Sequence, residues 1–335
     1  MSQHYPHIFK PFTVKRTTFR NRVVMPPMGS NLATFTGEVS EDMKNYYGLR
    51  ARGGTALITV ENACIDYPLA TNGTKQLRID NKQFIPGLYE LTERIHQYGA
   101  LASIQLNHAG ASAYPERLNG LQAVSSSSVP SKEGNPAPRP LEKCEILNIV
   151  QKYAEAAQRA VQAGFDMVEI HGGHSYLLDQ FLSPYYNKRT DEFGGSYENR
   201  ARFARLVVEA VRKAVGPWVP ISFRISADEF IEGGNTLDDT LKLMEYIEPE
   251  VDIINVSAAV NDSIQYQIDK CDLPDAWRAY LAEAVKKKFN KPVIASGNIR
   301  NPQVADQIIA EGKTGFIAIG RGLMADPDWA RKAQN

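Results

Sequence analysis

The sequence predicts an α/β domain folded as a closed (β/α)₈, or TIM, barrel. Short runs rich in β-branched residues alternate with longer segments of helical period, and this alternation is typical of βαβ units around a parallel sheet. Eight strand-sized runs can be counted, which is the number that closes such a barrel. A doubly wound sheet is the alternative, but its glycine-rich phosphate motifs, GxGxxG and GxxxxGK[ST], do not occur.

Each strand is predicted from a short apolar run. In chain order the eight expected strands are Arg22–Met25, Ala56–Val60, Leu101–Gln105, Met167–Ile170, Ile221–Ile225, Ile253–Val256, Val293–Ala295 and Gly315–Ile319. Between them, apolar residues recur at spacings of three and four, which predicts amphipathic helices. The expected helices are Pro86–Tyr98, Cys144–Ala163, Tyr197–Val215, Leu237–Ile247, Trp277–Phe289, Pro302–Glu311 and Pro327–Lys332.

The connection after the third strand is unusually long. Residues 111–143 contain AVSSSSVPSKEGNPAPRP and are too long and too rich in Pro, Ser and Gly for a simple link. We expect a loop or small hairpin that caps the barrel mouth, as part of one domain spanning residues 1–335. A passive surface excursion explains the same composition equally well.

The composition favours a small-molecule partner. The 38 Lys and Arg residues balance the 38 Asp and Glu residues, so no net field attracts the chain to nucleic acid or to an anionic membrane. Hydrophobic residues make up 43% of the chain, enough for a sizeable core. The sequence does not determine whether the protein forms a homo-oligomer.

Cysteine usage and the absence of targeting signals predict a cytoplasmic protein. Cys64, Cys144 and Cys271 are far apart and form no CxxC pair, which argues against a disulfide framework or a cysteine-built metal cluster. The start MSQHYPHIFKPF resembles neither a secretory signal nor a presequence. No apolar run approaches the ~18 residues that cross a bilayer.

Polar residues follow several of the predicted strands. In TIM barrels the active site lies at the carboxyl ends of the strands, so these residues should meet at one opening. They occur in Val60-Glu61-Asn62, Gln105-Leu106-Asn107-His108, Glu169-Ile170-His171-Gly172-Gly173-His174-Ser175-Tyr176 and Arg224-Ile225-Ser226-Ala227-Asp228.

The loops after the seventh and eighth strands resemble a phosphate site. Barrels often bind phosphate there, through backbone N–H groups. The loops contain Gly297 and Asn298, then Gly320 and Arg321. Glycine permits close approach of the backbone, and Arg321 offers a forked cation. The alternative is that the glycines only turn the chain into the next helix.

His171 and His174 frame two glycines at the end of the fourth strand, with Tyr176 close behind. This spacing should place both imidazoles near one cavity. Neutral imidazoles also bind metals, but no third ligand follows at a recognised spacing, so we expect no metal site.

These residues resemble the old yellow enzymes, a family of NADH:flavin oxidoreductases, in particular the branch with 2,4-dienoyl-CoA reductases and enoate reductases. The similarity runs from about His7 to Asp328. Its most specific part is EIHGGHSYLLDQFLSPYYNKRTDEFGGSYENRARF, and RNRVVMPPM, IQLNHAG, ISFRISADE, ASGNI and IGRGLMADP stand around it in the family's order.

The resemblance implies a non-covalent FMN at the barrel mouth, reduced by NAD(P)H. Gln105 would bond the pyrimidine edge of the flavin, and Arg224 would face N1 and O2, where a fixed cation stabilises the charge of the reduced ring. The phosphate would lie over the two glycine loops. The full set of cofactor residues is Pro27, Met28, Gly29, Asn62, Gln105, Arg224, Gly297, Asn298, Gly320 and Arg321.

The resemblance also implies an ene-reductase. His171 and His174 would bond the carbonyl oxygen of an enone, enoate or thioester, flavin N5 would deliver hydride to the β-carbon, and Tyr176 would protonate the α-carbon. The alternatives are a flavin-dependent NAD(P)H oxidase, an amine dehydrogenase, or the barrel of a longer iron–sulfur flavoenzyme. The sequence does not identify the alkene or distinguish NADH from NADPH.

The chain departs from the family after MPPM, where many relatives have Thr or Cys near the flavin. Here Gly29 and Ser30 follow, so either Ser30 replaces the tuning contact or the contact is missing. Multidomain relatives continue into a cysteine-rich cluster segment, which does not follow here before Asn335.

Overall fold

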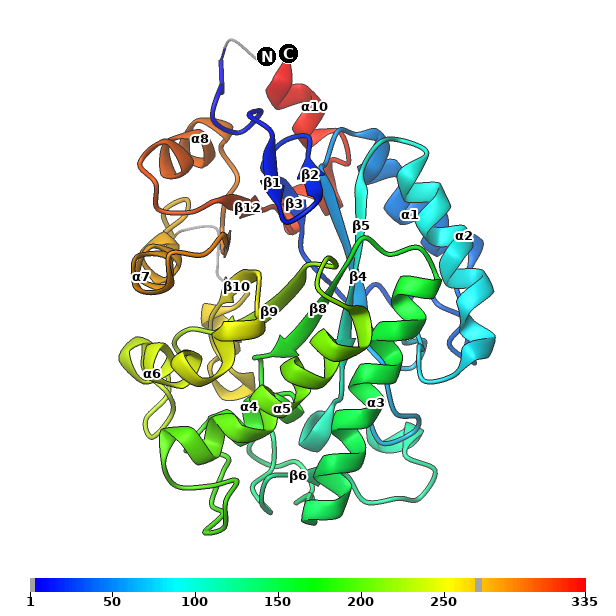
Figure 1. The fold of residues 1–335 in the computed structure, drawn as a ribbon, viewed down its shortest axis with the longest axis vertical. Helices are drawn as coiled ribbons and strands as arrows, with labels where there is room; N and C mark the ends of the chain where they lie inside the picture. The colour runs from blue at the N-terminus through cyan, green and yellow to red at the C-terminus, as the bar shows by residue number, and fades with distance from the viewer. Residues whose placement is uncertain (1–3, 269–272) are drawn as a thin grey trace.

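The eight predicted strands close into one parallel barrel (Figure 1). The computed structural model describes residues 4–268 and 273–335. Around the barrel the order is β10-β11-β12-β3-β4-β5-β8-β9. Every strand lies within a few residues of its predicted range, which confirms the (β/α)₈ prediction. The strands are β3 (Val23–Met25), β4 (Leu57–Cys64), β5 (Leu101–Asn107), β8 (Met167–Gly172), β9 (Ile221–Ser226), β10 (Ile253–Ser257), β11 (Val293–Ser296) and β12 (Phe316–Ala318).

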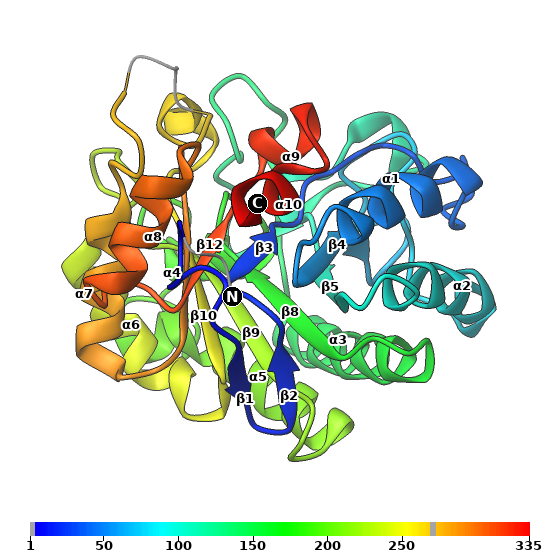
Figure 2. The ribbon, with the colours of Figure 1, turned by 90° about the horizontal axis from the view of Figure 1, so that it is seen from above.

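Helices surround the strands, as the view along the barrel shows (Figure 2). The seven predicted helices are present, with shifts of one or two residues at some of their ends. They are α2 (Ile85–His96), α3 (Lys143–Gln162), α5 (Tyr197–Val215), α6 (Leu237–Ile247), α7 (Ala279–Phe289), α8 (Pro302–Ala310) and α10 (Trp329–Gln334). Short 3₁₀ turns occur at Lys82–Phe84, Gly110–Ser112, Pro115–Arg117, Glu248–Glu250 and Asn261–Tyr266.

Three further helices are absent from the prediction: α1 (Glu41–Arg52), α4 (Leu177–Leu182) and α9 (Arg321–Ala325). The buried face of α1 includes a glycine and an arginine, so its apolar period is weak. The start of α1 could have been predicted from Ser40, because serine is a preferred N-cap residue. In the structure its hydroxyl accepts a hydrogen bond from the backbone N–H of Met43 at 3.1 Å. The other two have only five or six residues, too few for a periodic pattern.

A β-bulge interrupts the pairing of β4 with β5 at the barrel mouth. The register is regular up to Val60, opposite Ile104, and shifts before Ala63. The shifted residues are Glu61 and Asn62. A bulge changes the directions of the side chains on the bulged strand. The side chains of Glu61 and Asn62 therefore depart from the regular alternation between the two faces of β4.

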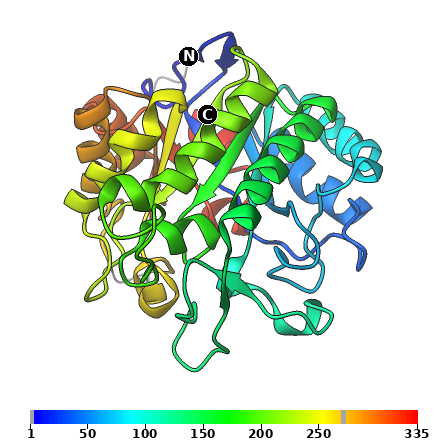
Figure 3. The ribbon, with the colours of Figure 1, turned by 60° about the horizontal axis from the view of Figure 1, so that its bottom comes forward.

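The insertion between β5 and α3 extends from the end of the barrel opposite the two termini (Figure 3). Its strands β6 (Val124–Ser125) and β7 (Arg139–Pro140) pair in parallel. The segment is therefore a loop and not an antiparallel hairpin, so the loop is the correct one of the two predicted forms. It lies against the β8 turn, where the Ser112 hydroxyl donates to the carbonyl of Ser175 at 2.7 Å.

A small hairpin closes the amino-terminal end of the barrel. Strands β1 (Phe12–Val14) and β2 (Thr17–Phe19) are antiparallel. Phe19 packs on Phe316 of β12 with ring centroids 4.8 Å apart, and both side chains are buried. Together with apolar residues from the starts of the barrel strands they form a separate core cluster, so this end is filled with side chains and the cavity lies at the other end.

Within the described ranges, no helix has both the length and the apolar character needed to cross a membrane.

Candidate active site

One cavity of about 750 Å³ opens at the carboxyl ends of the strands. Every site residue predicted from the sequence lines it, although these residues come from seven different strands or the loops after them. The shared lining residues are Pro27, Met28, Gly29, Asn62, Gln105, His171, His174, Tyr176, Arg224, Gly297, Asn298, Gly320 and Arg321. The structure thus brings together groups that are up to 294 residues apart in the chain, from Pro27 to Arg321.

The turn after β8 carries the histidines and the tyrosine. A Cβ on Gly172 would lie 2.3 Å from the Phe223 ring, and one on Gly173 would lie 2.7 Å from the backbone nitrogen of Ser226. Both positions need glycine because β9 approaches the turn so closely. The chain then passes through His174 and Ser175 with φ of 59° and 60°, a left-handed conformation that residues with side chains rarely adopt.

This strained turn is held by its surroundings. The backbone N–H of His174 donates to the Ser226 hydroxyl at 3.0 Å, and that of Ser175 donates to the Asp179 carboxyl at 2.7 Å. Tyr176 then forms the N-cap of α4 in extended conformation. Backbone strain of this kind persists only where neighbouring contacts determine it, and it is concentrated at functional sites.

His171, His174 and Tyr176 form a compact ring cluster. The centroid of the His171 ring lies 5.2 Å from that of His174 and 4.8 Å from that of Tyr176. Burial, together with the positive charge of Arg224, lowers the pKa of both histidines well below the usual value. Both imidazoles are therefore neutral near neutral pH, and each has one N–H to donate.

The contacts of His171 indicate which of its ring nitrogens is protonated. His171 Nδ1 accepts the backbone N–H of Gly173 at 3.3 Å, which leaves the proton on Nε2. His174 Nε2 lies 2.7 Å from the hydroxyl of Ser257, a cavity residue that the sequence did not single out.

Arg224 and Gln105 lie at the inner part of the cavity. Gln105 Nε2 donates to the buried carboxylate of Glu169 at 2.9 Å, which orients its amide. Glu169 also accepts from Ser222 at 2.9 Å and from Asn255 at 2.8 Å. This buried carboxylate partly compensates the guanidinium of Arg224, whose pKa is lowered by burial and raised by the charge of Glu169.

The other end of the cavity has the features of an anion site. Gly297 has a φ of 126°, and a Cβ there would lie 2.3 Å from Nε of Arg278. Arg321 donates to the side chain of Asn298 at 3.3 Å. Gly297 thus lets the Arg278 guanidinium approach the backbone closely, and the guanidinium groups of Arg278 and Arg321 both line the cavity. Nothing in the sequence marked Arg278, because it lies in an ordinary helical segment.

The residues present fit FMN. The cavity is within the ~300–1,000 Å³ usual for cofactor sites. At one end Nε of Arg224 is buried without a hydrogen-bond partner among the described residues, which suits a ring that gains negative charge. At the other end the arginines suit a phosphate.

Ser30 does not replace the missing Thr or Cys. Its hydroxyl and its backbone N–H both donate to the Glu61 carboxylate, the latter at 2.9 Å. Ser30 is also absent from the lining of the large cavity, whereas Gly29 is part of it. Of the two readings of Gly29 and Ser30, the structure supports the one in which this contact is missing.

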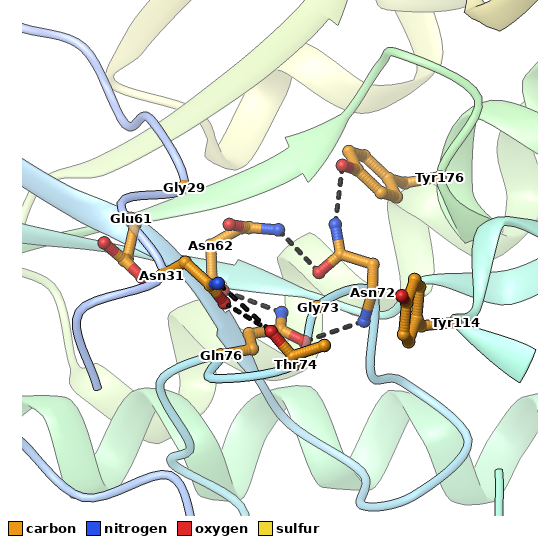
Figure 4. Close-up of a pocket in the computed structure, with 10 residues that line it drawn as sticks. All are labelled: Gly29, Asn31, Glu61, Asn62, Asn72, Gly73, Thr74, Gln76, Tyr114 and Tyr176. Carbon is orange, nitrogen blue, oxygen red and sulfur yellow. Dashed lines mark hydrogen bonds between the residues drawn. The ribbon is translucent and has the colours of Figure 1, made fainter. Parts of the chain in front are cut away.

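A second, smaller cavity of about 360 Å³ adjoins the first at Gly29, Asn62 and Tyr176 (Figure 4). Its wall contains side-chain amides of which Asn72 is the most notable, because Asn72 Nδ2 donates to the Tyr176 hydroxyl at 2.6 Å. The sequence analysis missed Asn72. It lies in a turn-forming Asn-Gly pair, a signal for local backbone shape and not for chemistry.

Among the described residues, no group of three His, Cys, Asp or Glu side chains is arranged to hold a metal ion. Cys64 is a buried free thiol and Cys144 an exposed one, and Cys271 lies outside the described residues.

Residues 7–335 match the family described as NADH:flavin oxidoreductase / NADH oxidase. An NADH oxidase of Thermoanaerobacter brockii is 45% identical over 99% of this chain, and the match covers 51% of that protein. An NADPH dehydrogenase of Clostridium acetobutylicum is 35% identical over 96% of this chain and is matched over 92% of its own length. The chain therefore spans about half of the first relative and most of the second.

Solved structures give the same result for the fold. A 2-naphthoyl-CoA reductase in complex with 2-naphthoyl-CoA superposes with a TM-score of 0.93 at 26% identity, covering 98% of this chain and 52% of that one. Morphinone reductase superposes with a TM-score of 0.85 at 28% identity, covering 99% and 90%.

Proposed function

Since this chain belongs to the NADH:flavin oxidoreductase / NADH oxidase family, with FMN as cofactor and NAD(P)H as hydride donor, we propose that it is an ene-reductase. The proposed substrate is an α,β-unsaturated carbonyl compound, an enone, enoate or thioester. When bound, FMN supplies the redox chemistry, taking hydride from NAD(P)H and returning hydride to the β-carbon of the substrate.

The observation that carries the proposal is the ring cluster after β8. Two neutral imidazoles, His171 and His174, meet at the cavity beside a phenol, Tyr176. Two N–H donors suit a carbonyl oxygen on which negative charge develops, and they act best when fixed in advance and shielded from water. In this proposal Tyr176 would give its proton to the α-carbon, so hydride and proton together would saturate the double bond.

The remaining predicted residues have supporting roles in this proposal. Arg224 and Gln105 would hold the polar edge of the flavin, with Gln105 oriented by Glu169. The loops at Gly297 and Gly320, with Arg321, would hold its phosphate. We also propose that residues 111–143 limit access to the mouth, because they contact the β8 turn through Ser112.

The alternatives fit the cavity less well. An amine substrate would bring a cation next to Arg224, and no Asp or Glu is among the described residues that line the large cavity. Reduction of oxygen is the activity named for one relative, and it needs neither the paired donors nor the phenol. Oxygen reduction therefore remains the second candidate function, and the test below also measures reoxidation of the flavin by oxygen.

The test follows the flavin absorbance of the purified holoprotein in two anaerobic steps. NAD(P)H should bleach the flavin, and cyclohexenone should restore its colour. His171→Ala should slow the second step by about 10²-fold, because one donor to the developing oxyanion is lost. Its reoxidation by oxygen should stay at the wild-type rate. A flavin that is reoxidised by oxygen but by no activated alkene would contradict the ene-reductase proposal and favour the oxidase.

A further inference from the structure

The second cavity contains a chain of hydrogen bonds that ends on Tyr176 (Figure 4). Asn62 Nδ2 donates to Asn72 Oδ1 at 2.9 Å, and Asn72 Nδ2 donates to the Tyr176 hydroxyl oxygen at 2.6 Å. Asn62 lines both cavities, so this chain of hydrogen bonds extends from the large cavity to the Tyr176 hydroxyl by way of the second cavity, called the side pocket below.

The loop that carries Asn72 is fixed to the barrel. The backbone N–H of Asn72 donates to Gln76 Oε1 at 2.8 Å, and Gln76 Nε2 donates to the carbonyl of Asn62 at 2.8 Å. One residue earlier, the carbonyl of Thr71 accepts the backbone N–H of Tyr114 at 2.8 Å. Asn72 is therefore held in place before any ligand binds, between the β4 bulge and the insertion.

The direction of these bonds determines where the phenol proton can point. A side-chain amide nitrogen donates and does not accept, and it is Asn72 Nδ2 that lies 2.6 Å from the Tyr176 oxygen. The Tyr176 oxygen must therefore accept from Asn72 and cannot donate to it. The single O–H proton of Tyr176 is left free to point elsewhere, and the large cavity is the space that Tyr176 lines on its other side.

The same bond favours the product of proton transfer. When the O–H bond of Tyr176 breaks and a C–H bond forms at the α-carbon, the negative charge of the enolate moves to the phenolate oxygen. A hydrogen bond to a charged oxygen is about twice as strong as one to a neutral oxygen. Consistent with this, burial raises the pKa of Tyr176, while the bond from Asn72 and then the charge of Arg224 oppose that rise.

The side pocket is otherwise poorly suited to a ligand. Its amides are already paired with protein atoms: Asn31 Nδ2 donates to the Thr74 hydroxyl at 3.0 Å, and its Oδ1 accepts the backbone N–H of Lys75 at 2.8 Å. A pocket whose polar groups satisfy one another has little to gain from binding a polar molecule. Its geometry instead supports the residue that it shares with the active site.

We infer that Asn72 is a positioning residue for Tyr176: it directs the phenol proton into the cofactor cavity and stabilises the phenolate left after proton transfer. The inference rests on the proposed ene-reductase function, in which Tyr176 is the acid. The tyrosine then recovers its proton from water, so the cycle consumes one hydride from NAD(P)H and one proton from solvent.

The test compares Asn72→Leu and Asn72→Asp with Tyr176→Phe in the FMN-loaded protein. Asn72→Leu removes the donor, and it should slow reoxidation of the flavin by cyclohexenone about 10- to 100-fold. Asn72→Asp should be slower still, because a carboxylate would accept the phenol proton and hold it away from the cavity. Flavin reduction by NAD(P)H and reoxidation by oxygen should stay at wild-type rates.

Thr74→Val is the matched control, since it removes a hydrogen bond of the same pocket without touching Tyr176. The double variant Tyr176→Phe/Asn72→Leu should be no slower than Tyr176→Phe alone, because Asn72 acts only through the phenol. The pH at which the reoxidation rate of Asn72→Leu falls by half should also shift, which a general loss of packing would not cause.

Three results would overturn the inference, and the first would also overturn the acid assignment of Tyr176. If Tyr176→Phe reoxidises at the wild-type rate, the acid assignment of the proposed function fails and the role of Asn72 fails with it. If Tyr176→Phe is slow while Asn72→Leu is as fast as wild type, or if the two effects multiply in the double variant, only the role of Asn72 fails.

Discussion

Two buried carboxyl groups, those of Asp179 and Glu229, lie close to the turn after β8, and the pKa of each is raised. Asp179 accepts from the backbone of Ser175, and Glu229 accepts from the Ser183 hydroxyl at 2.8 Å and from the backbone N–H of Asn235 at 3.0 Å. Burial raises the pKa of both, that of Glu229 to about 7. The charge of Glu229 raises the pKa of Asp179 further, so ionising both is unfavourable.

This raised pKa predicts a pH dependence of stability. The unfolded chain releases the Glu229 proton near the ordinary value of 4.5, whereas the folded protein keeps it up to about 7. Between these values the folded state binds more protons, so the free energy of unfolding falls as pH rises, by up to about 3 kcal/mol. Glu229→Gln should flatten this slope in urea titrations between about pH 5 and 8. Parallel profiles for the two proteins would contradict the assignment.

At the scale of the element, the β8–α4 turn carries the residues proposed to act on the substrate. Four features meet there: two close-packed glycines, two left-handed residues, the paired histidines and the N-cap tyrosine. The turn is determined by contacts to β9, to the insertion and to α4, so its shape does not depend on the substrate. Such preorganisation is what a fixed pair of donors requires.

Gly173→Ala tests whether the turn can accommodate a Cβ atom at this position. Its Cβ would meet the backbone of β9, which cannot rotate away as a side chain could, so we expect a loss of ~2 kcal/mol or more in unfolding free energy. Gly87→Ala in α2 is the control. There the new Cβ meets Val39 at 3.5 Å, an ordinary contact, and a helical alanine should stabilise by up to ~1 kcal/mol. Equal effects in urea unfolding would refute the steric argument.

At the scale of the whole molecule, the amino-terminal apolar cluster and the candidate active site lie at opposite ends of the barrel. The β1–β2 hairpin packs its aromatic residues into the amino-terminal end, while the carboxyl end holds the cavity and the insertion (Figure 1). This division is usual in TIM barrels, where the carboxyl face carries the active site and the amino-terminal face contributes to stability.

Phe19→Ala should therefore cost stability without affecting the site. Phe19 is fully buried, and its removal should lower the free energy of unfolding by ~3–5 kcal/mol through lost burial and the cavity left behind. FMN affinity, measured by fluorescence titration at a temperature where the variant is folded, should not change. Phe35→Ala, at a side chain that is 66% exposed, is the control for stability. A marked loss of FMN binding in Phe19→Ala would show that the two ends are coupled.

Much of the fold could be predicted because the barrel repeats one simple pattern. Each strand is a short apolar run and most helices have an apolar stripe, so local sequence is informative about both. Helix α1 was not predicted because its buried face includes Gly48 and Arg50, which weakens its apolar pattern. Helices α4 and α9 were not predicted because five or six residues are too few to show a helical period. The parallel pairing of β6 with β7 depends on contacts between chain segments that local sequence does not encode.

The site was predictable to the extent that it lies on the strand ends and in family motifs. The rule that strand ends converge placed His171, Gln105 and Arg224 at one opening, and the structure places all of them in one cavity. Asn72, Ser257 and Arg278 were missed because each is an unremarkable residue in its own segment. They reach the site only through the folded chain, by way of a loop, a strand end and a helix start.

The sequence by itself determined the barrel, the family and the set of residues that line the large cavity, because apolar periodicity and ordered motifs are local properties. Only the tertiary structure decided the charge states and the contacts of those residues. It made the two histidines neutral by burying them, it occupied Ser30 with Glu61, and it placed Asn72 behind Tyr176. Charge states and hydrogen-bond directions depend on neighbours distant in the chain, and these become neighbours only when the barrel closes.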